Sequence, residues 1–125
     1  MQLIHTQTHQ HLHALHPEAA TKIVDLQQIL SQVSLDDKLL SLCSEYFDAT
    51  LRETDWTPSG EVSALEAAVT DVCAQFRLSV ADVTDRQIAA LNQHLSADEV
   101  YNLMYAIYLI EGSKRLELML EGMTS

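Results

Sequence analysis

The sequence predicts a single all-α domain, built as a compact bundle of about five helices. The chain has 125 residues, which is near the commonest size of one domain. Only three glycines and two prolines are present while 47% of the residues are hydrophobic, so little of the chain suits turns or bulges. Stretches rich in Ala, Leu, Glu and Gln favour helix. We expect a polar, His-rich N-terminal arm over 1–16 and one helical domain over 17–125.

Five amphipathic segments follow one another after this arm. The first helix starts at Pro17, because proline suits the first helical turn. The second follows Ser34, whose hydroxyl can accept from a free backbone N–H, and the third opens at Pro58 and runs to about residue 77. Thr84 and Ser96 each precede an amide or acid three positions later, so capping boxes are expected to start the fourth and fifth helices.

The fifth helix is expected to run from Ala97 to about Glu121 and to end near Gly122. Apolar residues occupy most of its circumference, in two stripes. One stripe contains Val100, Leu103, Met104, Ile107 and Leu118, and the other contains Tyr101, Tyr105, Tyr108 and Arg115. A small domain has too few other helices to cover both stripes, so the sequence predicts a homo-oligomer with the fifth or the second helix at its interface.

The charge and hydropathy of the chain exclude several classes of partner. Seven Lys and Arg stand against 18 Asp and Glu, and the formal charge of −11 repels nucleic acid and anionic lipid. The longest strongly apolar run, 103–110, is far shorter than the ~20 residues of a membrane span. The first twenty residues contain no Lys or Arg and do not resemble a secretory signal. We therefore expect a cytoplasmic protein whose two cysteines are free thiols.

The second half of the chain resembles the alkylhydroperoxidase D-like and carboxymuconolactone decarboxylase-like superfamily. The stretches that carry the resemblance, in the order and spacing of the family, are Ser63–Val72, Val83–Leu91, His94–Leu103 and Ala106–Leu116. Upstream, His16–Glu18 and Leu35–Leu39 resemble the opening helix and the start of the redox-helix segment. The resemblance implies the compact all-α fold of this family.

The redox motif of the family's peroxidases is absent from the sequence. Those members carry Cys-x-x-Cys-x-x-x-His after an upstream Glu, with one thiolate attacking peroxide and the second resolving it. The stretch with similar spacing begins at Cys43, where Tyr46 and Thr50 take the places of the second Cys and the His. Alternatively, the redox hairpin is deleted and 54–61 replaces it. Either alternative makes the chain a degenerate member of the family.

Cys43, with Glu45 and Tyr46 close in sequence, is the candidate catalytic group for a residual thiol peroxidase. A cysteine on an apolar helix stripe is also an ordinary core residue. Nearby acids raise the pKa of a thiol and so oppose its activation. A disulfide with Cys73 would require the two Cα atoms to lie within about 7 Å.

The His-rich arm offers imidazoles, which suit Zn, Ni or Cu. His9, His11 and His13 occupy alternate positions, so all three would lie on one side only if the chain were extended. On a helix, only His9 and His13 would lie on the same face. No Cys or acid lies among them to complete a site. We therefore predict no metal site, with these three histidines as the candidates if one exists, and otherwise a polar tail or docking arm.

Tyr101, Tyr105, Tyr108 and Arg115 have two interpretations. They could line a pocket for an apolar molecule with an acidic end, since phenols combine ring contact with a hydrogen-bonding tip and a guanidinium binds oxyanions. They could instead form a subunit interface, where Tyr and Arg are enriched, and this is the interpretation that we favour.

The sequence leaves three functional hypotheses. The first is a non-redox carboxymuconolactone decarboxylase-like protein that binds a small organic acid or lactone at a helix-lined subunit boundary and transforms it without a cofactor, as a lyase or isomerase, as the resemblance implies. The second is a non-enzymatic oligomeric interaction module. The third is a thiol peroxidase that uses Cys43.

Overall fold

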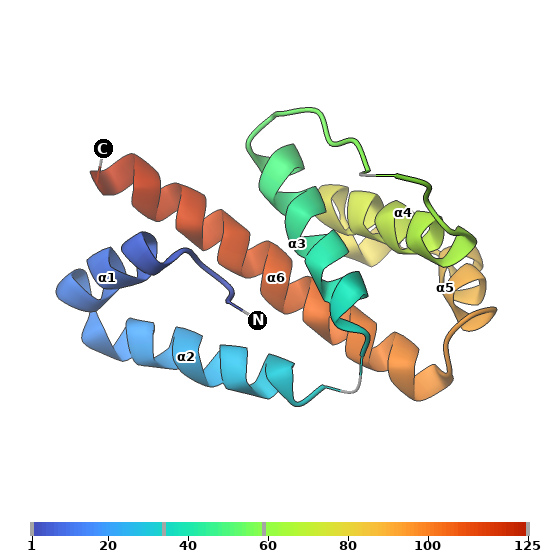
Figure 1. The fold of residues 1–125 in the computed structure, drawn as a ribbon, viewed down its shortest axis with the longest axis horizontal. Coiled ribbons are helices and arrows are strands. Elements are labelled where there is room, and N and C mark those ends of the chain that lie inside the picture. Colours follow the sequence, from blue (N-terminus) through green and yellow to red (C-terminus); the bar gives the residue numbers. More distant parts are fainter. Residues whose placement is uncertain (1, 34, 59, 125) are drawn as a thin grey trace.

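The computed structural model describes residues 2–33, 35–58 and 60–124. This part of the chain contains six α-helices, one short 3-10 helix and no strand, which confirms the all-helical prediction (Figure 1). The elements are α1 (Thr6–Leu15), α2 (Pro17–Ser31), α3 (Asp37–Leu51), α4 (Ala64–Leu78), η1 (Val80–Asp82), α5 (Asp85–Asn92) and α6 (Ala97–Thr124). Within the described ranges, no helix is both long enough and apolar enough for a membrane crossing.

The longest helix, α6, is the central element around which the others pack. Figure 1 shows α1 and α2 on one side of it and α3, α4 and α5 on the other. Direct contacts join α6 to α1, α3 and α5, while α4 packs on α3 and α5. The centre of the core contains Phe47 from α3, Val69 from α4 and Leu103 and Ile107 from α6, all fully buried. α6 therefore connects the two halves of the molecule.

The His-rich segment is folded into the bundle and is not the polar arm outside the helical domain that the sequence suggested. Residues 6–15 form α1, which packs on α2 and α6. Leu3 and Ile4, just before the helix, are 1% exposed, and Leu12 and Thr8 lie one turn apart on its buried side. This segment has few apolar residues and many histidines, so its hydrophobic periodicity is weak. The sequence pattern therefore did not predict the helix.

Two helix starts differ from the predicted ones. Ser34, the predicted cap of the second helix, lies outside the described residues, and the α3 cap is Asp36, whose carboxylate accepts from the backbone N–H of Lys38 at 2.9 Å. The predicted start of the third helix at Pro58 is wrong, because α4 begins at Ala64. Its Ser63 cap makes a reciprocal capping box with Glu66, which satisfies the free N–H groups of the first turn.

The other predicted boundaries agree better with the structure. α2 begins at Pro17, as predicted, and the capping boxes at Thr84 and Ser96 are both present. The end predicted near Gly122 is wrong, because α6 continues through this glycine to Thr124. A glycine can end a helix with a positive φ, but it can also remain helical, and sequence alone does not distinguish the two cases.

Candidate functional site

The outer face of α6 exposes the tyrosines that the sequence analysis selected. Tyr101 is 75% exposed, Tyr105 38% and Tyr108 64%. Between residues 101 and 123, the exposed positions of the helix are Tyr101, Tyr105, Tyr108, Gly112, Arg115, Met119, Gly122 and Met123, which we call the α6 outer face. The face therefore carries aromatic rings, thioethers, two glycines and one cation, and no acid.

Arg115 is already engaged within its own chain. Its Nε forms an ion pair with Glu111, one turn earlier, and its Nη2 donates to the backbone carbonyl of Arg77 at 3.3 Å. The guanidinium thus links α6 to the end of α4, although more than half of the side chain remains exposed.

An apolar groove of about 290 Å³ lies between α2 and α6, beside the α6 outer face. Ile23 and Leu26 line it from α2, and Tyr108, Leu109 and Leu116 line it from α6. Of the four residues predicted to form an acid-binding pocket, Tyr108 alone belongs to this lining. The structure therefore places the predicted set along one exposed helix face and does not gather it around this groove.

The three candidate groups of the peroxidase hypothesis point in different directions from α3. Cys43 is fully buried, Glu45 is exposed, and Tyr46 is half-buried with its ring edge-on to Phe47 and Trp56. Glu45 instead lines a separate hollow of about 200 Å³ with Lys38, Trp56 and Glu66. No arrangement of these three groups around one reacting atom is present.

Cys43 meets Cys73 across the contact between α3 and α4. The two Sγ atoms are 3.7 Å apart, and both cysteines are free thiols in the core. The hydrogen bond with Cys43, followed by burial, raises the pKa of the Cys73 thiol far above its usual range. A thiol that keeps its proton is a poor nucleophile, which argues against Cys73 as a reactive group. Both side chains are fully buried, so the pair has the character of core packing.

The histidines in and next to α1 make different contacts. His9 Nε2 lies 3.2 Å from the carbonyl oxygen of Ala20, and His16 accepts from the backbone N–H of Ala19 as the α2 cap. His11 is half-buried and His13 is exposed. Among the described residues, the group of three potential metal ligands contains none of His9, His11 and His13, but it does contain His5.

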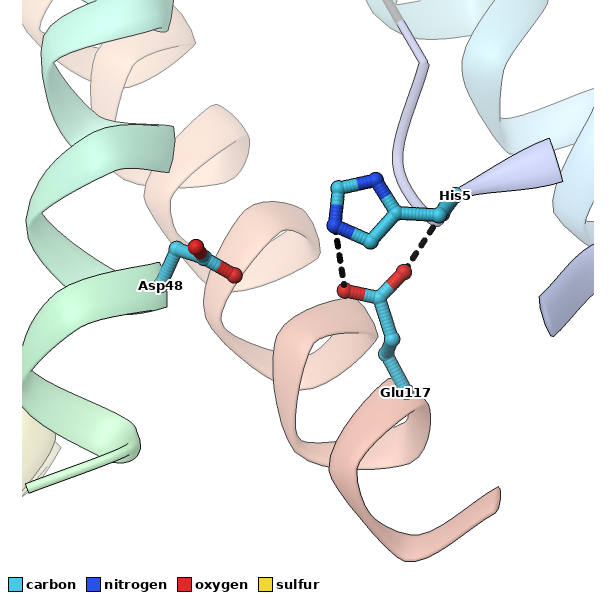
Figure 2. Close-up of side chains that lie close together, drawn as sticks. All are labelled: His5, Asp48 and Glu117. Carbon is cyan, nitrogen blue, oxygen red and sulfur yellow. Dashed lines mark hydrogen bonds and ion pairs between the residues drawn. The ribbon is translucent and has the colours of Figure 1, made fainter. Parts of the chain in front are cut away.

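His5 belongs to a charged cluster at the junction of the N-terminal segment, α3 and α6. The acids of this cluster are Asp48, Glu117 and Glu121, and its cations are Arg52 and Lys114. Glu117 is fully buried, and Figure 2 shows its carboxylate directed at His5. Its Oε2 accepts from the backbone N–H of His5 at 2.5 Å, while its Oε1 lies 3.5 Å from His5 Nε2.

The cations of the cluster are held unequally. Arg52 donates to both carboxylate oxygens of Glu121, at 2.8 and 2.9 Å, and to Asp48 at 3.3 Å. The hydrogen bonds from Arg52 lower the pKa of Glu121 below its ordinary 4.5. Lys114 Nζ, in contrast, lies 3.7 Å from Asp48 and 3.8 Å from Glu117, beyond hydrogen-bond length.

The sequence contains a signal for this cluster that does not take the form of a short motif. Lys114, Glu117 and Glu121 continue the three- and four-residue spacing of the buried stripe that includes Ile107 and Ile110. Charged residues in the register of an apolar stripe must be paired when they are buried. Their partners on α3 are distant in sequence, so periodicity alone could not identify them.

No protein-family model, curated protein sequence or solved structure matches this chain. The resemblance to the alkylhydroperoxidase D-like superfamily therefore stays a prediction from the quoted stretches.

Proposed function

We propose that the chain is an interaction module that pairs with a second copy of itself through the α6 outer face. The observation that carries this proposal is the composition of that face. The chain has a formal charge of −11, yet the exposed positions of its longest helix between residues 101 and 123 contain no acid. A solvated helix face is normally charged or polar, whereas tyrosine, methionine and arginine are typical of interfaces.

The spacing of the face supports a helix as the partner. Steps of four and three residues alternate from Tyr101 through Gly112 to Gly122, which gives a mean repeat of 3.5 residues. This repeat keeps one stripe facing a neighbouring helix along their common length. From residue 101 to residue 119 the stripe is about 27 Å long, at 1.5 Å per residue.

The order of residues along the face supports an antiparallel, two-fold arrangement. If two copies of α6 cross at residue 110, Tyr101 lies opposite Met119 of the partner subunit, and Tyr105 lies opposite Arg115 of the partner subunit. These are a sulfur–aromatic and a cation–π pair. Tyr108 then lies opposite Gly112 of the partner subunit, where the missing side chain leaves room for the ring. Because the pattern is the same in both directions, one stripe can complement itself, as a two-fold interface requires.

Gly112 supports a close external partner independently. It stands in the interior of α6, where glycine costs roughly 0.5–1 kcal/mol relative to alanine. A Cβ at this position would meet no heavy atom within 4 Å in its own chain. Packing within the protomer therefore does not require glycine here, whereas the approach of a partner's tyrosine ring would.

The hypothesis of an organic acid or lactone ligand remains a separate prediction. The α2–α6 groove offers it a location beside the proposed interface, but the groove lining is apolar apart from Tyr108, Glu111 and Ser113. Arg115, the predicted acid-binding group, is paired with Glu111. Saturable thermal stabilisation by carboxylic acids, lost in Arg115→Lys, would support this hypothesis.

Sedimentation velocity over a series of micromolar concentrations tests the proposed pairing. We expect the parent chain to sediment as a particle of twice its 14.0 kDa mass. Tyr108→Glu places a carboxylate in the centre of the stripe. It should weaken association and raise the dissociation constant by at least tenfold, which is about 1.4 kcal/mol. Higher salt should strengthen the parent dimer, because it screens the repulsion between two acidic chains.

Leu78→Glu is the matched control. Leu78 is 75% exposed at the end of α4, so this change adds the same charge to an exposed apolar site outside the α6 outer face. It should leave the association unchanged. A parent chain that sediments at 14.0 kDa at every concentration would refute the proposal, as would an equal loss of association in both variants.

A further inference from the structure

We propose that His5, Asp48 and Glu117 form a binding site for a divalent transition-metal ion of the zinc class. The three residues come from the N-terminal segment, α3 and α6, and the fold brings one ligand atom of each within 4.8 Å of the other two (Figure 2). The site is separate from the α6 outer face and does not depend on the pairing of two copies.

The geometry between His5 and Glu117 already suits a shared ion. His5 Nε2 and Glu117 Oε1 are 3.5 Å apart, too far for a good hydrogen bond. Two ligands that each lie about 2.1 Å from a tetrahedral zinc ion are separated by about 3.4 Å. A small movement of the partly exposed Asp48 side chain would bring in the third ligand.

The donor set determines the class of ion. One imidazole nitrogen with two carboxylates is a donor set that zinc and its neighbours in the first transition row accept. Magnesium and calcium prefer oxygen ligands throughout, so the imidazole selects against them. We therefore expect the site to prefer zinc or cobalt to magnesium.

Glu117 is the strongest independent indication of a ligand. It is fully buried, and within the described part of the chain its Oε1 has no hydrogen-bond partner. Its Oε2 accepts from the backbone N–H of His5, which fixes the plane of the carboxylate and directs Oε1 into the cluster. A buried carboxylate oxygen without a donor is costly, and a bound cation would satisfy it.

Lys114 is the competitor for the same position. Its ammonium group lies 3.7 Å from Asp48 and 3.8 Å from Glu117 Oε1, so it partly neutralises the two acids without hydrogen-bonding to them. Arg52 lies 3.6 Å from Glu117 Oε1, but its strongest hydrogen bonds go to Glu121. An entering metal ion would displace the ammonium group of Lys114 and compete with Arg52 Nε for Asp48, but it would leave the Arg52–Glu121 pair in place.

The site would connect the N-terminal segment to the rest of the fold. Leu3 and Ile4 are buried immediately before His5, and the backbone N–H of Leu3 donates to the Gln27 side chain at 2.8 Å. An ion held by His5, Asp48 and Glu117 would tie this segment to α3 and α6. Metal binding should therefore raise the melting temperature, since an ion that binds only the native state stabilises it.

Calorimetric titration of the tag-free full chain with Zn²⁺ tests the site, and Co²⁺ absorption reports the coordination. We expect one ion per chain, and we expect His5→Ala and Asp48→Asn each to weaken binding by about tenfold or more. Lys114→Met should strengthen binding, because it removes the competing cation and keeps the apolar stem. His13→Ala is the matched control, since His13 is an exposed histidine of α1, and it should bind as the parent does.

Two results would overturn the proposal. One is the absence of saturable Zn²⁺ binding in both the parent and Lys114→Met, with circular dichroism showing that each is folded. The other is parent-like binding in both His5→Ala and Asp48→Asn, which would place the ion away from this site, on the histidines of α1.

Discussion

Glu117 is the buried charge that the surrounding cations and hydrogen-bond donors must compensate. A fully buried carboxylate loses its hydration, and this loss is tolerable only if nearby cations and donors replace the water. Among the described residues, the backbone N–H of His5 donates the one short hydrogen bond to this carboxylate. Arg52 and Lys114 supply positive charge at 3.6 and 3.8 Å. The position of the N-terminal segment is therefore linked to the charge balance of the core.

Glu121 gives this cluster a pH dependence with a definite sign. Hydrogen bonds from Arg52 lower the pKa of Glu121 below its ordinary 4.5. Because the native pKa is below the unfolded one, the stabilisation is complete above the unfolded pKa and is lost as the pH falls through the native pKa. Both side chains are about a third exposed, so solvent screening limits the effect to about 0.5–1 kcal/mol.

Glu121→Gln should therefore lower the free energy of unfolding at neutral pH and make little difference at low pH. Urea denaturation at a series of pH values measures both stability curves. They should converge as the pH falls below 4.5, the ordinary pKa of a glutamate. Glu61→Gln, in the exposed loop before α4, is the control and should follow the parent at every pH. A constant difference between Glu121→Gln and the parent across the acid range would contradict the assigned pairing.

At the scale of single elements, α6 combines two roles on different sides. Its inner side is buried against α1, α3 and α5 and includes the charged residues Lys114 and Glu117. Its outer face carries the tyrosines and methionines. Because apolar residues lie on both sides and charged residues are also buried, the helix shows almost no separation of apolar and polar sides. A helix of this kind is usually enclosed on all sides, but the outer face of α6 is exposed.

Gly112→Ala separates the effect of this glycine on the stability of α6 from its effect on the proposed interface. Alanine should stabilise the isolated helix by roughly 0.5–1 kcal/mol, because its Cβ meets open space in the protomer. The same Cβ should meet the partner's Tyr108 ring and weaken association. We expect higher unfolding stability in the monomeric Tyr108→Glu background and a weaker dimer in the parent background.

Gly122→Ala is the control for this prediction. Gly122 is also exposed and open at its Cβ, but it lies outside the three proposed pairs. Its change should leave the dissociation constant unaltered. If Gly112→Ala also left the association unaltered, the antiparallel pairing at residue 110 would be excluded.

The elements that sequence predicted well are those with local signals. Pro17, Thr84 and Ser96 determine helix starts through interactions within one turn, so the sequence contains all the information. α1 lacks such a signal, because Leu3, Ile4 and Leu12 are buried by contacts with distant segments. The start of α4 was missed because Thr57-Pro58 and Ser63 with Glu66 are competing local signals, and the capping box determined the start.

For the candidate sites too, the sequence predicts what a local pattern contains and not the contacts between distant segments. The tyrosine stripe was recognised because it repeats along one helix, and its exposure is consistent with the interface interpretation. The cluster of His5, Asp48 and Glu117 joins residues up to 112 positions apart, and no short-range pattern relates them. The contact between Cys43 and Cys73 likewise became apparent only once α3 and α4 were placed together.

At the scale of the whole molecule, α6 links two small groups of helices (Figure 1). Its outer face is exposed in the part of the chain that the structure describes. The net charge of −11 disfavours general self-association, because like-charged chains repel each other. Pairing confined to a face without acids is compatible with this charge. The molecule therefore combines an acidic surface that limits non-specific contacts with one apolar face that is suited to a specific contact.

Disulfide trapping between two variants that each add one cysteine to the α6 outer face tests the antiparallel α6 pairing most directly. In the proposed dimer, residue 105 lies opposite residue 115 of the other copy, while the two copies of residue 105 are about 15 Å apart along the axis. A disulfide requires Cα atoms within about 7 Å. Mild oxidation should therefore cross-link a mixture of Tyr105→Cys and Arg115→Cys, but neither variant alone. Cys43 and Cys73 are buried, and the parent chain under the same oxidation is the control. Cross-linking of each variant by itself, or no cross-link in the mixture, would contradict the pairing.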